Sequence, residues 1–489
     1  MSVALQLGII VGYLLLALAV GLVAYRTTDR TAEDFYLASR SVGTVVLLFT
    51  TFATLLSAFT FFAGPNIAYR EGPEWVLVMG LMDGIVFAIL WYVVGYKQWL
   101  LGRRYEYVTL GEMLGDRFGS RRLRGLVAGI SLLWLFPYVM LQQVGAGTAL
   151  QALTDGAVPY AVGAGLITAF MILYVVVAGF RGIAWTDTLQ GAFMLVTTWI
   201  ALAWVLAAVG GPGAATAALE AEAADHLALG GDFYTVQWML STAITIGFGV
   251  AMFPQVNQRF FAAGSEAVLK RSFALWPLLC VLLFVPSFLL GAWARGLDVA
   301  IAEGENVLPA VLAEYTPVWF AALVIAGAMA AMMSSSDSML LSGSSYFTRD
   351  LYRPFVEGSV SERREDLLAR LGVVGFATAA FVGSLVQPAT LFELGDAAFS
   401  GFAQLALPVL VALYWRRTTR AGITAGILAS QAFYLSSLFT AVVPSAYGGW
   451  TAGLVGMGLG LVVTVGVSAV TTPAADERRA IYFDGLGAD

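Results

Sequence analysis

The ninth apolar stretch of this chain, TPVWFAALVIAGAMAAMMSSSDSMLLSGSSY at residues 316–346, decides its fold class. As a helix it is long enough to cross the roughly 30 Å hydrocarbon core of a bilayer. Asp337 is its only charged residue. Core helices of soluble proteins are usually shorter, and lipid is the solvent that accepts so long an apolar segment. The stretch therefore predicts a transmembrane helix.

Twelve further apolar stretches, separated by short polar breaks, flank it. Together they predict thirteen transmembrane helices near residues 4–24, 43–64, 73–101, 125–152, 159–179, 185–209, 235–256, 272–294, 316–346, 367–386, 391–415, 421–441 and 449–471. Hydrophobic residues make up 59% of the chain and charged residues 12%, about half the share of a soluble domain. The predicted fold class is an all-α polytopic membrane protein.

The basic residues indicate the direction in which these helices cross. With the amino terminus outside, 24 of the 26 Lys and Arg residues fall in inward loops or the tail, and only Arg70 and Arg295 fall outside. Positively charged loops stay on the cytoplasmic side. The split predicts a multi-pass plasma-membrane protein with its amino terminus outside and its carboxyl terminus in the cytoplasm. Residues 1–472 would form the transmembrane domain and residues 473–489 a short cytoplasmic tail.

The remaining composition excludes several classes of function. Cys280 is the only cysteine and His226 the only histidine, so a disulfide framework and thiolate or histidine metal chemistry are unavailable. The sequence shows neither a nucleotide-binding loop nor a nucleophile–base constellation, which argues against an enzyme. The composition demands a lipid bilayer as partner and predicts no nucleic acid and no obligate protein partner.

Small residues, most of them serine, form one face of the ninth segment. They recur at spacings of three and four: Ala331, Ser334, Ser335, Ser338, Ser342 and Ser345. Hydroxyl and carbonyl oxygens on one face suit a hard, weakly held cation. Close helix packing explains the same stripe, since tight membrane interfaces also use small residues. Asp337 favours the cation, because a carboxylate at the bilayer centre costs about 2.5–3.5 kcal/mol and needs compensation.

Three other polar features lie inside the predicted spans. Residues 50–60 and the following 64–66 weaken the second span as a helix, which predicts an unwound stretch whose carbonyls bind an ion. Ser and Thr that bond back to their own turn would instead leave a regular helix. Asp83 in the third span is either functional or structurally paired. Asp187, at the inner start of the sixth span, is either part of a site or an anion favoured by the helix dipole.

At these residues the sequence resembles the sodium–solute symporter family, which includes proline, pantothenate, monocarboxylate and sugar symporters. The resemblance covers about residues 5–470, and the pantothenate and monocarboxylate branch is the most similar. It rests on five landmarks in order: Glu33-Asp34-Phe35-Tyr36-Leu37-Ala38-Ser39-Arg40-Ser41; Ser57-Ala58-Phe59-Thr60-Phe61-Phe62-Ala63-Gly64-Pro65; Gly179-Phe180-Arg181-Gly182 with Trp185-Thr186-Asp187; Ser334-Ser335-Ser336-Asp337-Ser338 with Phe347-Thr348-Arg349-Asp350-Leu351-Tyr352; and Tyr414-Trp415-Arg416-Arg417.

The resemblance implies a five-plus-five inverted-repeat core with broken helices, with repeats at about 43–209 and 235–415. It implies sodium as the coupling ion, with these ligands: the backbone carbonyls of Ala53, Leu56 and Ala331 and the hydroxyls of Ser334 and Ser335. A possible second cation site would comprise Asp187, Ser334, Asp337 and Ser338. Relatives that bind an additional sodium carry serine at the position of Asp337, so this chain would hold two carboxylates there. Alternatively, Asp337 bonds to neighbouring serines and Asp187 only caps its helix.

The same resemblance implies a solute pocket. Its residues would be Leu55, Ser57, Phe59, Thr60, Met79, Asp83, Phe248 and Met252. Leu55 stands where sugar transporters carry asparagine and proline transporters carry aspartate, and Met79 stands where sugar transporters carry glutamate. The mostly apolar pocket favours a small carboxylate or an amino-acid-like anion over a polyol.

The predicted function is secondary active symport of a small organic solute with sodium, by alternating access. The alternatives are proton coupling in the same fold, a channel, and a non-transporting membrane sensor. Proton coupling would depend on the titration of Asp83, Asp187 or Asp337. A channel would never move solute beyond its electrochemical gradient, and a sensor would usually append signalling domains.

Overall fold

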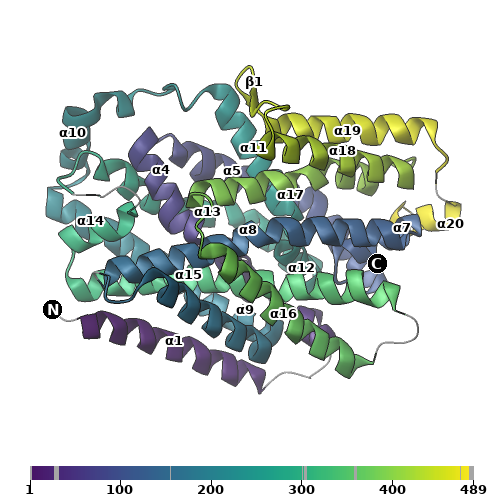
Figure 1. Cartoon of the computed structure of the whole chain (residues 1–489), viewed down its shortest axis with the longest axis horizontal. Helices are drawn as coiled ribbons and strands as arrows, with labels where there is room; N and C mark the ends of the chain where they lie inside the picture. Colours follow the sequence, from purple (N-terminus) through teal and green to yellow (C-terminus); the bar gives the residue numbers. More distant parts are fainter. Residues whose placement is uncertain are drawn as a thin grey trace.

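Helices make up almost all of the described chain, and most of them run along the long axis of the molecule (Figure 1). The computed structural model describes residues 3–26, 32–154, 156–299, 301, 305–356, 361–473 and 475–483. The inward-loop residue Arg30 and the last part of the predicted tail, residues 484–489, lie outside these ranges.

The secondary-structure elements follow one another with short connections. The α-helices are α1 (Val3–Tyr25), α2 (Ala32–Leu37), α3 (Thr44–Leu55), α4 (Gly64–Glu71), α5 (Asp83–Leu90), α6 (Tyr96–Tyr105), α7 (Leu110–Phe118), α8 (Arg121–Leu153), α9 (Tyr160–Val209), α10 (Pro212–Ala223), α11 (Val236–Met252), α12 (Pro254–Ala262), α13 (Glu266–Ala294), α14 (Val307–Tyr315), α15 (Val318–Ser345), α16 (Glu362–Ser384), α17 (Leu391–Tyr414), α18 (Arg420–Phe439), α19 (Ala452–Val470) and α20 (Asp476–Phe483). The π segments are η2 (Phe59–Ala63), η3 (Val76–Met82), η4 (Trp91–Gly95) and η6 (Tyr346–Tyr352), and the 3-10 segments are η1 (Ala38–Arg40), η5 (Ala224–Leu227) and η7 (Arg353–Phe355). Strands β1 (Ala446–Tyr447) and β2 (Trp450–Thr451) pair antiparallel between α18 and α19.

Within the described ranges, eleven helices are long and apolar enough to cross a membrane, and two bent helix pairs bring the number of spans to as many as thirteen. The spans follow the predicted segments closely along the chain. The largest difference is at the ninth span, which continues through η6 and η7 to Phe355. A helix does not end where its apolar residues end, because polar side chains can continue it beyond the lipid. The predicted fold class, an all-α polytopic membrane protein, is confirmed.

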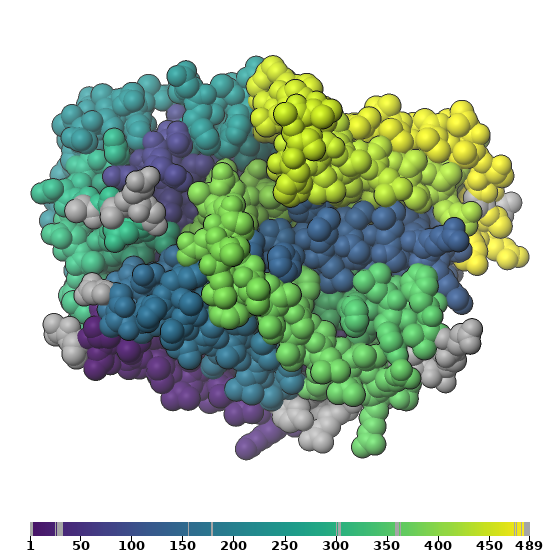
Figure 2. All heavy atoms as spheres, in the orientation of Figure 1, coloured from purple at the N-terminus to yellow at the C-terminus, as the bar shows by residue number. Residues whose placement is uncertain are grey.

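Burial separates the helices that face lipid from those that form the core. In α15, 83% of the apolar window is buried inside the protein, against 22% in α1. The α1 helix exposes Leu15, Leu16 and Val23, as lipid contact requires. Figure 2 shows α1 along one edge of the molecule and the pair α18 and α19 along the opposite edge. The core lies between these edges, around α15.

The second span is broken, as its helix-weakening residues predicted. The α3 helix and the segment η2–α4 meet at 62°. Leu56, after the end of α3, has extended backbone dihedrals of φ −75° and ψ 122°. The Ala58 N–H donates to Gln142 Oε1 at 2.8 Å and the Phe59 N–H to Ser57 Oγ at 3.1 Å. Side chains thus satisfy amides that unwinding releases, and the regular-helix alternative is wrong.

The seventh span is broken at Phe253, inside a segment that the sequence analysis gave as 235–256 without locating a break. The α11 and α12 helices meet at 56°. Pro254 causes the break, because proline lacks an N–H and keeps the residue before it out of the helical region. Phe253 accordingly has φ −59° and ψ 129°. The Asn257 side chain donates to the Phe253 carbonyl at 2.7 Å.

The fifth and sixth spans follow each other without a loop. The α9 helix is interrupted at Gly179, whose φ of 59° favours glycine. A Cβ at this position would also lie 2.9 Å from Cδ2 of Phe35. The helix resumes at once, so Asp187 lies about two turns inside it. The prediction that Asp187 stands at the start of the sixth span was wrong, and its position gives it no helix-capping role.

Candidate ion and solute sites

The unwound end of α3 faces the serine stripe of α15. The Ser335 hydroxyl donates to the Thr54 carbonyl oxygen at 2.8 Å and also to the Leu56 carbonyl oxygen. Ala53 and Ala331 lie one turn away on the same two helices, and both are fully buried. Unwinding leaves carbonyl oxygens without their helical partners. The structure therefore brings together, on two adjoining helices, the residues predicted for the first sodium.

Ser334 connects this region to α9. Its hydroxyl donates to Asp187 Oδ1 at 2.5 Å, and the Thr50 hydroxyl donates to Asp187 Oδ2 at 2.6 Å. Because the Ser334 hydrogen is directed to Asp187, the lone pairs of the Ser334 oxygen remain available to a cation. Asp187 is thus engaged on both of its oxygens.

Arg259, which the sequence analysis placed in an inward loop, lies among the residues predicted for the second cation. Its side chain is 1% exposed, and its Nη2 forms an ion pair with Asp187 Oδ2 at 3.0 Å. The same nitrogen donates to Ser338 Oγ at 2.6 Å. The dipeptide Phe253-Pro254 was the signal that could have revealed this placement. It breaks the span and lets the polar residues of α12 fold back into the core.

Asp337 lies outside this group of bonded side chains. It is 2% exposed, and its Oδ1 has no hydrogen-bond partner among the described residues. The neighbouring serines bond elsewhere, Ser334 to Asp187 and Ser335 to α3. A buried carboxylate oxygen without a partner is costly. This position requires a cation, a proton or a donor that the protein does not itself supply to Oδ1.

Aromatic rings fill the space around the first break. Phe59 packs against Phe392, with ring centroids 5.6 Å apart, and against Phe399 at 5.2 Å. Gly395 permits this approach, because a Cβ there would lie 2.3 Å from the Phe59 ring. Phe399 also stacks on Phe253 at 5.7 Å. The two helix breaks therefore meet at one aromatic cluster, made of Phe59, Phe253, Phe392 and Phe399.

Three of the predicted solute residues offer polar atoms. Ser57 Oγ lies 3.1 Å from Tyr138 Oη. Thr60 Oγ1 and both carboxylate oxygens of Asp83 are buried without a partner among the described residues. Asp83 directly follows η3, and π segments often occur at functional sites. The described structure therefore shows no structural pairing of Asp83. The other predicted solute residues supply apolar surface: Leu55, Phe59, Met79, Met252 and the half-buried Phe248.

A cavity of about 740 Å³ lies on the α14 side of the aromatic cluster. Phe392 belongs to both, since it lines the cavity and packs on Phe59. Asn66 and Asn306 form part of the cavity wall, and Asn66 Nδ2 donates to Asn306 Oδ1 at 2.9 Å. The aromatic cluster therefore borders this cavity through Phe392.

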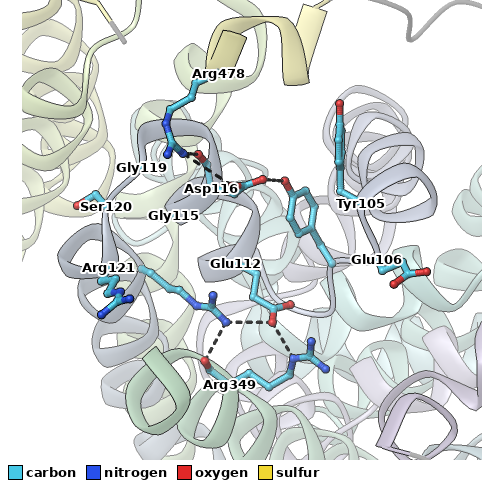
Figure 3. Close-up of a pocket in the computed structure, with 12 residues that line it drawn as sticks. Tyr105, Glu106, Glu112, Gly115, Asp116, Gly119, Ser120, Arg121, Arg349 and Arg478 are labelled. Atoms are coloured by element: carbon cyan, nitrogen blue, oxygen red, sulfur yellow. Dashed lines mark hydrogen bonds and ion pairs between the residues drawn. The ribbon is translucent and has the colours of Figure 1, made fainter. Parts of the chain in front are cut away.

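A second cavity of about 500 Å³ lies at the opposite end of the molecule, beside α7 and α20 (Figure 3). Glu112 Oε1 accepts from Arg349 Nε at 2.7 Å and from Arg124 Nη2 at 2.9 Å. Burial opposes the ionised form of Glu112. The charges of Arg349 and Arg124 outweigh this effect, and the pKa of the carboxyl lies below its ordinary value.

Part of the predicted tail is docked against this end. Tyr482 of α20 is fully buried, and its hydroxyl donates to the Met113 carbonyl of α7 at 2.8 Å. The guanidinium carbon of Arg117 lies 4.7 Å from the Tyr482 ring centroid and 5.2 Å from that of Phe483. The sequence analysis missed α20, because so short a helix depends on tertiary packing rather than on its own propensity.

Comparison with known proteins identifies the family. The model of the sodium:solute symporter family matches residues 35–430. The chain belongs to this family. The resemblance seen in the sequence motifs is confirmed, and with it sodium-coupled symport as the activity. Membership favours this symport over the proton-coupled carrier, the channel and the sensor considered above.

Relatives of this symporter match it over nearly its whole length. The sodium/pantothenate symporter of Escherichia coli (strain K12) is 29% identical over 433 residues, which cover 87% of this chain and 89% of the relative. That of Haemophilus influenzae is 28% identical, covering 93% and 97%. The monocarboxylate transport permease protein of Rhizobium johnstonii is 25% identical, covering 86% of each. The likeness is thus not confined to one segment.

Solved structures share the fold of this symporter. A Na+-coupled sialic acid symporter in a substrate-bound outward-open state has a TM-score of 0.82 at 19% identity, covering 96% of this chain and 98% of that one. MHP1, a nucleobase-cation-symport-1 family transporter in a closed conformation, has a TM-score of 0.61 at 15% identity, covering 92% and 97%. The fold is therefore one that transporters of another family also use.

Proposed function

We propose that this symporter carries a small carboxylate or an amino-acid-like anion with sodium, by alternating access. The observation that carries the proposal is the contact of Ser335 with the unwound end of α3, where hydroxyl and carbonyl oxygens of two helices converge. Support for a carboxylate comes from the relatives, which include sodium/pantothenate symporters and a monocarboxylate transport permease protein.

For the first sodium we assign one set of ligands: the carbonyls of Ala53, Leu56 and Ala331 and the hydroxyls of Ser334 and Ser335. These oxygens carry no formal charge, which suits an ion that must be released in every cycle. The C-terminal part of the serine stripe behaves differently. Ser342 and Ser345 donate to carbonyls of their own helix, at 3.1 and 2.7 Å. Within the described residues, the part around Ser335 is where the stripe donates to backbone carbonyls outside its own helix, which favours an ion site over simple packing.

For the solute we assign the region of the aromatic cluster and the cavity next to it. Its residues are Leu55, Ser57, Phe59, Thr60, Met79, Asp83, Phe248 and Met252. Apolar walls suit the body of the solute, and Ser57 and Thr60 offer polar atoms at the break. Asp83 needs a donor, because both of its oxygens are unpartnered. A carboxylate that also carries a hydroxyl, amide or ammonium group fits this requirement best.

We place the protein in the plasma membrane with the amino terminus outside and the carboxyl terminus in the cytoplasm. The distribution of the basic residues supports this orientation. The 740 Å³ cavity then opens outward, and the cavity beside Glu112 opens inward. We further propose core repeats at about 43–209 and 235–415 within a transmembrane domain of residues 1–472, followed by the tail 473–489.

Uptake into proteoliposomes tests the function. Radiolabelled pantothenate and small monocarboxylates are offered with an inward sodium gradient, or with potassium in its place, at fixed pH. A sodium symporter accumulates its solute above equilibrium only with sodium. Uptake that is indifferent to sodium, or that never exceeds equilibrium, would contradict the proposal. Competition by carboxylates with and without a donor group tests the assignment of Asp83.

We also propose a second cation site near Asp187, Asp337 and Ser338. Asp187 is already bonded to Ser334 and Arg259, so the charge that remains to be compensated belongs to Asp337. One monovalent cation held by Asp337 would neutralise it.

Replacing the carboxylate tests the second site. In Asp337→Asn, one positive charge fewer should accompany each solute, and the Hill coefficient for sodium should fall. Charge per solute is measured from the reversal potential of reconstituted protein. Asp116→Asn, outside the spans, is the control. An unchanged charge per solute in Asp337→Asn rules the second site out.

A further inference from the structure

Arg259 binds an oxygen set that three other helices supply. Its Nη2 contacts Asp187 Oδ2 on α9 at 3.0 Å, Thr50 Oγ1 on α3 at 2.9 Å and Ser338 Oγ on α15 at 2.6 Å. Nε donates to the Thr50 carbonyl at 3.2 Å and Nη1 to the Gln255 carbonyl at 3.0 Å. A buried guanidinium is thus held where four helices meet.

These oxygens exceed what one guanidinium nitrogen can satisfy. Nη2 carries two hydrogens, yet the oxygens of Asp187, Thr50 and Ser338 all lie within 3.0 Å of it. Hydroxyl oxygens and a carboxylate oxygen that converge on one point form a cation site, because a monatomic ion has no directional hydrogens to distribute. Here the guanidinium group of Arg259 supplies the positive charge between these three oxygens.

The charges around this point can be counted by helix. In the described sequence, α1 and α3 carry no charged residue, α12 carries Arg259 and α15 carries Asp337. The α9 helix adds Asp187 and Arg181, and Arg181 pairs with Asp34 at 2.6 Å. With both carboxylates ionised, Asp187, Asp337 and Arg259 sum to one negative charge. A single mobile cation completes the balance.

We propose that Arg259 is a tethered cation that replaces one sodium ion. The number of sodium ions bound in addition to the first sodium then follows the summed charge of Asp187, Asp337 and Arg259. This inference rests on the sodium assignments made above. It gives Arg259 a positioning role as well, since Asp187 Oδ1 orients the Ser334 hydroxyl of the first sodium site.

Counting bound sodium in charge variants tests the inference. Purified full-length protein is equilibrated with radioactive sodium alone, so that no solute need be known. Arg259→Gln should bind one sodium more than the wild type. Asp187→Asn should bind one fewer, because Arg259 then neutralises Asp337. The double variant Arg259→Gln/Asp187→Asn should return to the wild-type number.

The double variant is the decisive measurement. It removes both members of a buried ion pair and so leaves neither charge unpaired, which protects its folding. If Asp187 were a direct sodium ligand and Arg259 a structural residue only, the double variant would bind one sodium fewer, like Asp187→Asn. Arg117→Gln, which removes a buried arginine far from this site, should keep the wild-type number.

The outcomes separate this inference from the proposed function. Wild-type protein that binds no sodium would contradict the sodium assignments themselves. Wild-type protein that binds sodium, together with a double variant that fails to regain the wild-type number, would overturn the role of Arg259 alone. The same ordering of the four proteins in charge per solute, once a solute is found, is expected in reconstituted vesicles.

Discussion

Ser334 and Ser335 are neighbours in α15, yet their hydroxyls donate hydrogen bonds to different helices. Ser334 donates to the carboxylate of Asp187 on α9, and Ser335 donates to carbonyl oxygens at the end of α3. A cation shared by the Ser335 oxygen and the Leu56 carbonyl requires the Ser335 hydrogen to turn away from that carbonyl. Ion binding at this point therefore competes with a hydrogen bond of the protein.

Truncation of these serines should weaken sodium binding. Ser334→Ala or Ser335→Ala removes one oxygen from a desolvated ion and leaves the ion under-coordinated. Half-saturating sodium for uptake should rise several-fold, with the protein still inserted in the membrane. Ser342→Ala is the matched control, since Ser342 belongs to the same stripe but donates to its own helix at Met339. Equal behaviour of Ser335→Ala and Ser342→Ala would mean that the stripe only packs helices.

The α7 helix connects α8 and η6 at the proposed inner end of the molecule. Glu112 joins α7 to α8 through Arg124 and to η6 through Arg349. Its backbone N–H donates to Thr109 Oγ1 at 3.0 Å, in a capping box that starts the helix. Figure 3 shows Glu112 directed toward Arg349 inside the cavity. One carboxylate thus fixes both the start of α7 and its neighbours.

Loss of the Glu112 charge should destabilise the protein near neutral pH. Glu112→Gln keeps a residue type suited to the capping box but removes the carboxylate that Arg124 and Arg349 share, at a cost of about 3 kcal/mol. Arg124 then keeps only Asp350 and Arg349 only Glu365 among their described carboxylate partners. The pKa of Glu112 is depressed in the folded protein, so its contribution is present above the ordinary value of 4.5 and is lost as pH falls through the folded value.

Thermal unfolding at several pH values measures this effect. Glu112→Gln should melt below the wild type at pH 7, and the two curves should approach each other below pH 4.5, the ordinary value for the carboxyl. Arg121→Gln, an exposed residue that lines the same cavity, is the control and should melt like the wild type. A difference that is independent of pH would assign the effect to packing rather than to charge.

The whole molecule has two ends that differ in character. The α10 and α14 helices lie at one end, and α7 and α20 lie at the other (Figure 1). The basic residues gather at the α7 end, where Arg124 and Arg349 bind Glu112. The positive-inside rule therefore predicts that the α7 end faces the cytoplasm.

Labelling of single cysteines tests the orientation. Cys280 is the only cysteine, so Cys280→Ser gives a cysteine-free background. An impermeant thiol reagent should reach Gly213→Cys, on exposed α10, in intact cells. It should reach Ser361→Cys, just before α16, only after permeabilisation. Labelling of Ser361→Cys in intact cells would reverse the assigned orientation.

The sequence by itself determined the spans, the fold class and the family. Each hydrophobic run predicts a span by itself, because lipid accepts an apolar segment whatever its neighbours are. The arginines in the adjoining loops predict the direction of each span. The serine stripe of α15 could also be predicted from local sequence, because residues spaced three and four apart lie on one face of a helix. The weak helix residues around Ser57 also predicted the first break.

Only the tertiary structure decided what surrounds Asp187. Thr50, Asp187, Arg259 and Ser338 come from four distant parts of the chain, and no local pattern relates them. From the sequence, Arg259 was predicted to lie in an inward loop. In the structure, the break at Phe253 places α12, and Arg259 with it, inside the core. The docking of α20 likewise depends on contacts with α7 that eight residues cannot encode alone. Buried charges are paired across the fold, and their pairing follows from packing rather than from sequence order.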